Sequence, residues 1–194
     1  MLFASWVRAS RAVVTPSRGH SAPRACQGMI SLRPATIEDV PLLRHWDEQP
    51  HVLAANPNDD WGWETALREN PDWRESLIAE LDVRPIGFIE IIDPAREDTG
   101  YWGDVPPGLR AIDIWIGEDW ALGQGHGTEM MRLALARCFA PPEVKAVLID
   151  PLASNERAHR FYKHLGFEFL ERRRFGEDDC FVYCLERDRY RNSS

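Results

Sequence analysis

The chain has 194 residues, of which 44% are hydrophobic, and its formal net charge at pH 7 is −8. This length suits one domain with a substantial core, and the acidic balance argues against nucleic-acid binding, which needs a basic face, while suiting a cationic small-molecule partner. No apolar run approaches the roughly 18 residues of a membrane span, and the four cysteines lack the spacing of a zinc site or a disulfide framework. We therefore expect a cytoplasmic protein that binds neither membrane nor metal.

Residues 1–28 differ in composition from the rest of the chain. They contain several Arg, Ser and Ala residues but no Asp or Glu. Such composition resembles an organelle transit peptide. We favour the alternative of a start assigned too early, because Met29 directly precedes a strand-like segment. In either case we expect 1–28 to be a disordered extension and 29–190 to form a single domain.

The first half alternates between strand-like and helical segments. Thr36 can cap a helix that carries acids in its first turn, and two apolar, β-rich runs around the turn at 82–84 predict an antiparallel hairpin. In chain order we expect strand Ile30–Arg33, helix Thr36–Trp46, loop Pro50–Asp60, short helix Trp61–Glu69, strands Arg74–Leu81 and Pro85–Ile92, and a long loop Asp93–Gly108.

The second half repeats strand and helix more regularly. Gly166 stands where a helix C-terminus needs positive φ, and strand–helix–strand units predict right-handed crossovers on a mixed sheet. We expect strand Arg110–Gly117, helix Gly125–Phe139, strand Lys145–Ile149, helix Asn155–Leu165, and strands Phe167–Arg173 and Phe181–Glu186.

A glycine-rich run, Ala121–Thr128, lies between a strand and a helix N-terminus. Small residues at Gly123, Gly125 and Gly127 let an anion approach main-chain N–H groups, and the helix N-terminus adds partial positive charge. A nucleotide P-loop would need Lys and then Ser or Thr after the last glycine, and a dinucleotide-binding turn would need another glycine spacing. A run that merely turns the chain is the alternative. The pattern therefore indicates a ligand that carries a pyrophosphate.

Three segments carry a family resemblance: the strand Ala111–Gly117, the glycine-rich run, and Asp150–Phe167, in which Asn155 is followed seven residues later by Tyr162. Together they resemble the Gcn5-related N-acetyltransferase (GNAT) superfamily. The resemblance implies an α/β (α+β) fold, with a central mixed sheet of six to seven strands flanked by about four helices, and acetyl-CoA as cosubstrate. Leu122 departs from the pattern, since that superfamily usually has Arg or Gln there.

A narrower resemblance is to the bacterial aminoglycoside 6′-N-acetyltransferases. It rests in part on the pairing of Asp98, close to Tyr101 and Trp102, with Asp113 on the following strand. Such enzymes tend to carry an aromatic pair after the first helix, and Ala54–Pro57 replaces it here.

Asp113 is the candidate base. It lies between Ile112 and Ile114 in an apolar strand, so its side chain leaves on the opposite face from theirs. A buried carboxylate is costly without a cation or solvent, so Asp113 is suited to bind and deprotonate a substrate ammonium. A structural ion pair with Arg110 or Arg132 is the alternative.

Tyr162 is the candidate acid, because the resemblance implies that its phenol donates a proton to the departing thiolate. An ordinary core aromatic is the alternative. Asn155 resembles the residue that binds the pantetheine arm, and it could also cap the helix that follows. The full set of candidate cofactor-binding residues is Trp115, Ile116, Gly117, Gly123, Gln124, Gly125, His126, Gly127, Thr128 and Asn155.

Acidic and aromatic residues form the candidate substrate site. Several carboxylates around one cleft attract and orient a polycation, and aromatic rings supply walls for stacking. Solvated loop acids and ordinary aromatic packing are the alternatives. The candidate substrate-binding residues are Asp98, Tyr101, Trp102, Asp113, Asp150 and Asp178.

We expect an N-acetyltransferase, monomeric or homodimeric, that uses acetyl-CoA and transfers the acetyl group directly to a primary amine. The leading acceptor is the 6′-amino group of an aminoglycoside-like polycation, with antibiotic resistance as the consequence. One alternative is another metabolic amine or hydroxylamine of the siderophore type. A second is a non-catalytic protein that binds acyl-CoA.

Overall fold

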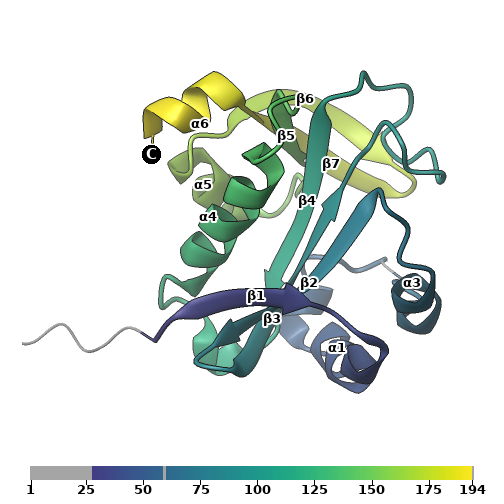
Figure 1. The fold of residues 1–194 in the computed structure, drawn as a ribbon, viewed down its shortest axis with the longest axis vertical. Coiled ribbons are helices and arrows are strands. Elements are labelled where there is room, and N and C mark those ends of the chain that lie inside the picture. The colour runs from purple at the N-terminus through teal and green to yellow at the C-terminus, as the bar shows by residue number, and fades with distance from the viewer. Residues whose placement is uncertain (1–27, 59, 194) are drawn as a thin grey trace, which may run out of the picture.

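The computed structural model describes residues 28–58 and 60–193, so the expected extension lies, apart from Gly28, outside the described residues. The strands form one seven-stranded sheet in the order β1-β2-β3-β4-β5-β7-β6 (Figure 1). The elements are β1 Ile30–Pro34, α1 Val40–Asp47, α2 Pro50–Leu53, α3 Trp63–Glu69, β2 Arg74–Leu81, β3 Arg84–Ile92, β4 Leu109–Ile116, α4 His126–Phe139, β5 Ala146–Ile149, α5 Glu156–His164, β6 Glu168–Phe175, β7 Asp178–Glu186 and α6 Arg187–Ser193.

The sheet is mixed, as expected. Its neighbouring strands are antiparallel except for β4 and β5, which run parallel because a crossover through α4 connects them. No helix among the described residues is long and apolar enough to cross a membrane.

Two helices were not expected. The short helix α2 lies inside the segment 50–60, which its Pro, Asn and Asp residues made look like a loop; Pro50 occupies its first turn, where a missing N–H costs nothing, and Val52 buries its side chain. The helix α6 is polar, and Tyr190 attaches it by stacking on Phe139 at a centroid distance of 4.7 Å.

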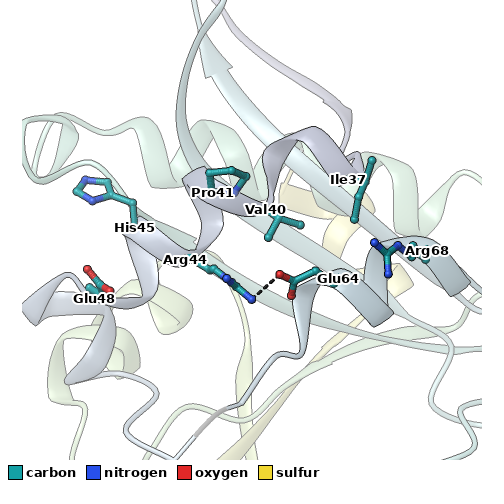
Figure 2. Close-up of a pocket in the computed structure, with 8 residues that line it drawn as sticks. All are labelled: Ile37, Val40, Pro41, Arg44, His45, Glu48, Glu64 and Arg68. Atoms are coloured by element: carbon teal, nitrogen blue, oxygen red, sulfur yellow. Dashed lines mark ion pairs between the residues drawn. The ribbon is translucent and has the colours of Figure 1, made fainter.

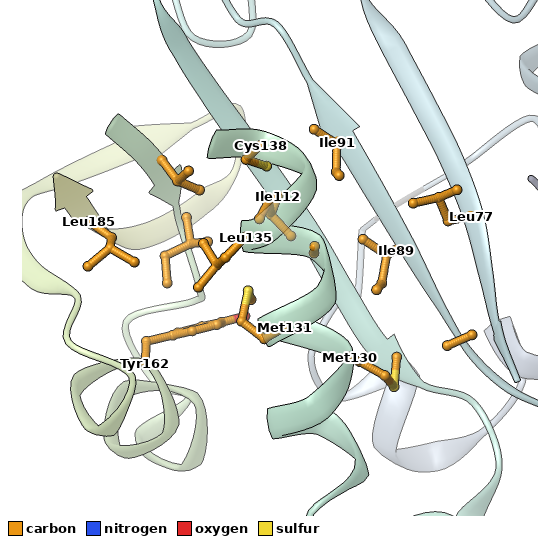
Figure 3. Packing of buried hydrophobic residues seen from close by; sticks show 14 of the residues in the cluster. Leu77, Ile89, Ile91, Ile112, Met130, Met131, Leu135, Cys138, Tyr162 and Leu185 are labelled. Atoms are coloured by element: carbon orange, nitrogen blue, oxygen red, sulfur yellow. The ribbon is translucent and has the colours of Figure 1, made fainter. Parts of the chain in front are cut away.

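Helices cover both faces of the sheet: α4 and α5 pack on one face, and α1 and α3 on the other (Figure 1). On the α4 face, Met130, Met131 and Leu135 pack over strand residues that include Ile112 (Figure 3). Residues of β4 alternate, so that Ile112 belongs to the α4 cluster and Trp115 to the cluster beneath α1 and α3. Asp113, two residues before Trp115, shares the face of Trp115.

The two flanks of β4 differ. Toward β3 it is paired from Ala111, which lies opposite Ile92, to Ile116, which lies opposite Gly87. Toward β5 the pairing covers only three residue pairs and ends where Ala111 lies opposite Leu148. The rest of β4 therefore presents backbone N–H and C=O groups to an opening between the two parallel strands.

Candidate active site

A cavity of about 660 Å³ lies at this opening. Its walls come from β4, the residues that follow β5, the first turns of α4 and α5, and residues 51–56 around α2. Among its lining residues are the expected acids Asp113, Asp150 and Asp178 and the phenols of Tyr101 and Tyr162. The structure thus brings together residues that lie far apart in the sequence.

The glycine-rich run forms the turn before α4. Gly123 and Gly125 have φ values of 73° and 87°, which favour glycine, and Gly125 is the N-cap of α4. A Cβ on Gly127 would lie 3.8 Å from the Cδ1 atom of Ile116 and the Cζ atom of Phe161, so the bare Gly127 forms part of the cavity wall. The first N–H groups of α4 have no partner within the helix, which suits an anion there.

Several of the candidate cofactor-binding residues have surroundings within the protein that do not by themselves indicate a cofactor. The side chain of Gln124 donates to the carbonyl oxygen of Trp120, and Thr128 follows in the first turn of α4. The His126 Nε2 atom is buried without a hydrogen-bond partner among the described residues. A Cβ on Gly117 would lie 2.1 Å from the Trp46 ring, so packing against α1 already requires glycine at that position.

Asn155 both caps a helix and lines the cavity, which are the two positions expected for it. It is the N-cap of α5, where its Oδ1 atom accepts a hydrogen bond from the Ala158 N–H at 3.0 Å, and it also lines the cavity. Trp115 and Ile116 line the cavity from β4.

Asp113 lies half-buried in the cavity wall. The two arginines considered as its structural partners pair with other acids: Arg110 lies 3.0 Å from Asp93, and Arg132 lies 2.7 Å from Glu129.

Tyr162 projects from α5 toward Met131 of α4, and its side chain is 8% exposed (Figure 3). Burial, followed by the nearby carboxylates of Asp113 and Asp150, raises the pKa of Tyr162 above the ordinary value of a phenol. The Tyr162 hydroxyl is therefore protonated at neutral pH, as an ordinary phenol also is.

Tyr101 belongs to the loop 93–108 and reaches across to the end of β5. Its hydroxyl donates a hydrogen bond to the Oδ2 atom of Asp150 at 2.6 Å, and its ring stacks on Phe175 at 4.4 Å between centroids. Burial and then the charge of Asp150 raise the pKa of Tyr101 above its ordinary value.

The other candidate substrate residues are dispersed. Asp178 lines the cavity and accepts a hydrogen bond from the Asn58 side chain at 2.6 Å. Asp98 is exposed on its loop, outside the cavity lining. Trp102 is 4% exposed and packs with Ala111 and Phe175, beneath Tyr101 rather than in the cavity wall.

Sequence reasoning missed two residues near the site. The His51 Nε2 atom lies 2.8 Å from the Ile116 carbonyl oxygen, so α2 closes one end of the cavity. Glu90 of β3 is 5% exposed, lies opposite Asp113 in the sheet, and accepts a hydrogen bond from Ser76 at 2.9 Å. Burial raises the pKa of Glu90. An acid inside the apolar run of β3 was the signal that could have drawn attention to Glu90.

A second hollow lies outside this region, between α1 and α3 (Figure 2). Arg44 pairs with Glu64 across it, and Arg68, His45 and Glu48 also line it. It contains none of the residues expected to act on a substrate. Within the parts of the chain that the structure describes, no group of three or more His, Cys, Asp or Glu residues could hold a metal ion.

Comparison with known proteins decides the family. The profile of an acetyltransferase (GNAT) domain matches residues 36–175, which are most of the chain. The chain belongs to the GNAT acetyltransferase family. It is therefore a transferase, and the GNAT fold expected from the sequence is confirmed.

Two known enzymes and one crystal structure show which members of the family this chain is similar to. This GNAT chain is 31% identical to the aminoglycoside N(6′)-acetyltransferase type 1 of Klebsiella pneumoniae over 153 residues, which cover 72% of this chain and 74% of the relative. It is also 24% identical to the lysine N-acyltransferase MbtK of Mycobacterium tuberculosis, over 72% of this chain and 69% of that one. A crystal structure of aminoglycoside acetyltransferase AAC(6′)-Ib in complex with coenzyme A and kanamycin superposes with a TM-score of 0.76 and 25% identity, covering 85% of this chain and 99% of that chain.

Proposed function

We propose that this acetyltransferase modifies the 6′-amino group of an aminoglycoside-like amino sugar. The observation that carries the proposal is the convergence of three carboxylates, Asp113, Asp150 and Asp178, on one cavity that also contains the buried phenol of Tyr162. A cavity with this excess of negative charge favours a polycation and orients it. The relatives that act on aminoglycosides support the same acceptor class.

Acetyl-CoA is the donor, and its thioester supplies the acetyl group. The open edge of β4 offers backbone groups that can pair with the amides of a pantetheine arm, and Asn155 lies on the facing wall. The turn at Gly123 and Gly125 presents main-chain N–H groups at the start of α4, where a pyrophosphate is favoured. With Leu122 in place of a polar residue, we assign pyrophosphate binding mainly to the backbone.

Asp113 and Tyr162 perform the proton transfers in the proposed mechanism. Asp113 takes a proton from the substrate ammonium, directly or through water, and the freed amine attacks the acetyl carbon. A C–N bond forms and the C–S bond breaks, and the nitrogen of the new amide releases its remaining extra proton to water. Tyr162 donates its phenol proton to the departing thiolate and regains a proton from solvent. Backbone N–H groups on the open edge of β4 supply donors for the developing oxyanion.

The test measures release of free thiol by the purified full chain with acetyl-CoA and a panel of amines. We expect turnover of a kanamycin-type compound at the 6′-nitrogen, located by mass spectrometry of the product. The matched control compound carries a hydroxyl in place of the 6′-amine and should release no thiol. Turnover of simple amines, but of no aminoglycoside, would contradict the proposal.

A cellular measurement complements the assay. Expression of the chain in a susceptible bacterium should raise its tolerance to aminoglycosides that carry a 6′-amine. Expression of Asp113→Asn to the same level should not. Equal tolerance with both proteins would mean that acetylation is not the cause.

A second candidate acceptor is a metabolic amine or hydroxylamine of the siderophore type. Two observations favour it: the likeness to a lysine N-acyltransferase, and the small residues Ala54 and Ala55, which line the cavity where aromatic walls for a sugar were expected. Lysine and N-hydroxylated amines therefore belong in the same panel. A kcat/KM for one of them above that for every aminoglycoside would select this candidate.

A further inference from the structure

The turn at Gly123 and Gly125 begins with Leu122, which offers no polar side chain to an anion. In the proposed function this turn therefore binds the pyrophosphate with backbone N–H groups. Such groups bind an anion well only when the turn already has the bound shape, because ordering a flexible loop on binding costs conformational entropy. The contacts that hold the turn in shape therefore bear on the affinity for acetyl-CoA.

Trp120 lies just before the turn and makes three contacts that could hold it. Its indole N–H donates a hydrogen bond to the Glu118 Oε2 atom at 2.7 Å. The Gln124 side chain donates to the Trp120 carbonyl oxygen and so links the two ends of the segment between them. The guanidinium of Arg84, at the start of β3, lies 4.1 Å from the centre of the Trp120 ring, which is a cation–π contact. Trp120 thus connects the turn to the neighbouring strand.

Glu118 connects Trp120 to the buried part of the molecule. The Glu118 Oε1 atom accepts a hydrogen bond at 3.2 Å from the indole N–H of Trp46, a fully buried side chain of α1. The Glu118 N–H also donates to the Ile86 carbonyl oxygen of β3 at 3.3 Å. Both carboxylate oxygens of Glu118 therefore accept indole N–H groups, one from the core and one from Trp120.

The exposure of Trp120 indicates that its ring does little for the core. Its side chain is 38% exposed, which is high for a tryptophan. A ring exposed to this degree gains less from burial than a core tryptophan does. The contacts to Glu118, Gln124 and Arg84 are therefore the main contribution of Trp120.

We propose that Trp120 is a positioning residue that holds the turn at Gly123 and Gly125 in the shape that binds the pyrophosphate of acetyl-CoA. The Gln124 side chain stabilises the same turn from within, where the sequence had suggested a contact to the cofactor. This inference rests on the proposed function in one respect, since it takes the pyrophosphate to lie on the turn. It does not depend on which amine accepts the acetyl group.

Three ligands separate positioning of the turn from a direct contact to the ligand. CoA carries the pyrophosphate and the adenosine, 4′-phosphopantetheine keeps one phosphate without the adenosine, and pantetheine carries no phosphate. Trp120→Phe keeps a ring beneath Arg84 and removes the indole N–H. We expect this variant to raise the Kd of CoA and of 4′-phosphopantetheine about 3- to 10-fold, the range of one hydrogen bond, and to leave the Kd of pantetheine unchanged. Calorimetric titration measures all three constants.

The other outcomes of these titrations contradict the proposal. A loss confined to CoA would mean that Trp120 contacts the adenosine. Equal losses for the three ligands, together with a lower Tm, would make Trp120 a residue of the fold. Unchanged binding of every ligand would mean that the turn keeps its shape without the indole N–H.

Trp73→Phe is the matched control for Trp120→Phe. Trp73 is also partly exposed and also lies beside a guanidinium, that of Arg74 at 5.3 Å from the ring centre, but at the other end of the β2–β3 hairpin. We expect this control to bind the three ligands as the native chain does. A loss of CoA binding in the control equal to that in Trp120→Phe would overturn the assignment of a specific role to Trp120.

A double-mutant cycle tests whether Trp120 and Gln124 hold the same turn. If they do, Gln124→Ala weakens CoA binding in the native chain but adds little in a chain that already carries Trp120→Phe. If the Gln124 side chain instead contacts the pyrophosphate, the two losses multiply, and the proposal is wrong.

The same titrations distinguish this inference from the proposed function. They contain no amine, so a failure of aminoglycoside turnover would refute the proposed acceptor and leave the role of Trp120 standing. If the native chain bound 4′-phosphopantetheine no more tightly than pantetheine, the proposed position of the pyrophosphate would be wrong, and this inference would fall with it. If the native chain preferred 4′-phosphopantetheine and Trp120→Phe preferred it equally, only the role of Trp120 would be refuted.

Discussion

The flanks of β4 can be compared directly because one strand provides both. On the β3 side, the pairing continues from Ala111 to Ile116, and the Gly117 N–H donates a hydrogen bond to the Ile86 carbonyl oxygen. On the β5 side, pairing stops at Ala111, and a cavity lined by acids and phenols follows. Pairing on the β3 side, which we call the closed flank, fixes the backbone of β4. On the β5 side, which we call the open flank, this fixed backbone holds Asp113 at the cavity. Substitutions on the open flank should therefore change rates, and substitutions on the closed flank should change stability.

The largest effect is expected at Asp113. Asp113→Asn removes the proposed base and should lower kcat/KM for the amine by about 10²- to 10⁴-fold, with little change in Tm. Steady-state kinetics and thermal unfolding measure the two quantities. Asp104→Asn, on the exposed loop before β4, is the matched control and should leave both unchanged. A loss of folding in Asp113→Asn would mean that this residue supports the fold of β4 and would contradict its assignment as the base.

Tyr162→Phe should lower kcat by about 10²-fold, because the thiolate then leaves without its proton donor. The raised pKa of Tyr162 has a further consequence: the acid form persists above pH 10, where an ordinary phenol ionises. The native chain should therefore show no fall in kcat from loss of this proton between pH 7 and pH 10. A descending limb in that range that Tyr162→Phe abolishes would contradict the assignment.

The same substitution at two glycines compares a tightly packed position, Gly117 against Trp46, with a position in the cavity wall, Gly127. Gly117→Ala places a Cβ 2.1 Å from the Trp46 ring, so we expect overpacking to lower the free energy of unfolding by about 1–3 kcal/mol. Gly127→Ala meets its nearest atoms at 3.8 Å, an ordinary contact distance, and should change stability by less than about 0.5 kcal/mol. Denaturant unfolding of the two variants measures the difference. Equal losses would show that the cavity wall at Gly127 is packed as tightly as the surroundings of Gly117.

The smallest effect is expected from a larger residue at Gly127. Gly127→Leu extends into the cavity wall between Ile116 and Phe161, so it should raise KM for acetyl-CoA several-fold. KM for the amine should change less, because the acids lie elsewhere in the cavity. Initial rates with each substrate varied in turn measure both constants. A rise confined to KM for the amine would place the acceptor, not the donor, beside α4.

The sequence predicted the strands well because apolar alternation and turn residues are local signals. It predicted the Asn155 cap and the glycine turn for the same reason, since both depend on neighbouring residues. It missed α2, whose four residues carry turn-forming types, and α6, whose attachment depends on a contact between Tyr190 and Phe139 far apart in the chain.

The candidate site was predictable only in part. Asp113 and Tyr162 stand out by pattern, but which loop acid reaches the cavity depends on the path of residues 93–108. Asp98 and Trp102 lie on that loop outside the cavity lining, while Tyr101 reaches Asp150. Glu90 faces Asp113 only through strand register, which the sequence of one strand does not contain.

The short parallel contact between β4 and β5 also bears on the order of folding. The hairpin of β2 and β3 joins neighbouring residues, whereas β4 and β5 meet only after the intervening α4 segment has closed a long loop. Such non-local pairing forms slowly, because the entropy of loop closure is lost before the contacts form. We therefore expect the carboxylates of the cavity to come together late in refolding, after the β2–β3 hairpin has formed.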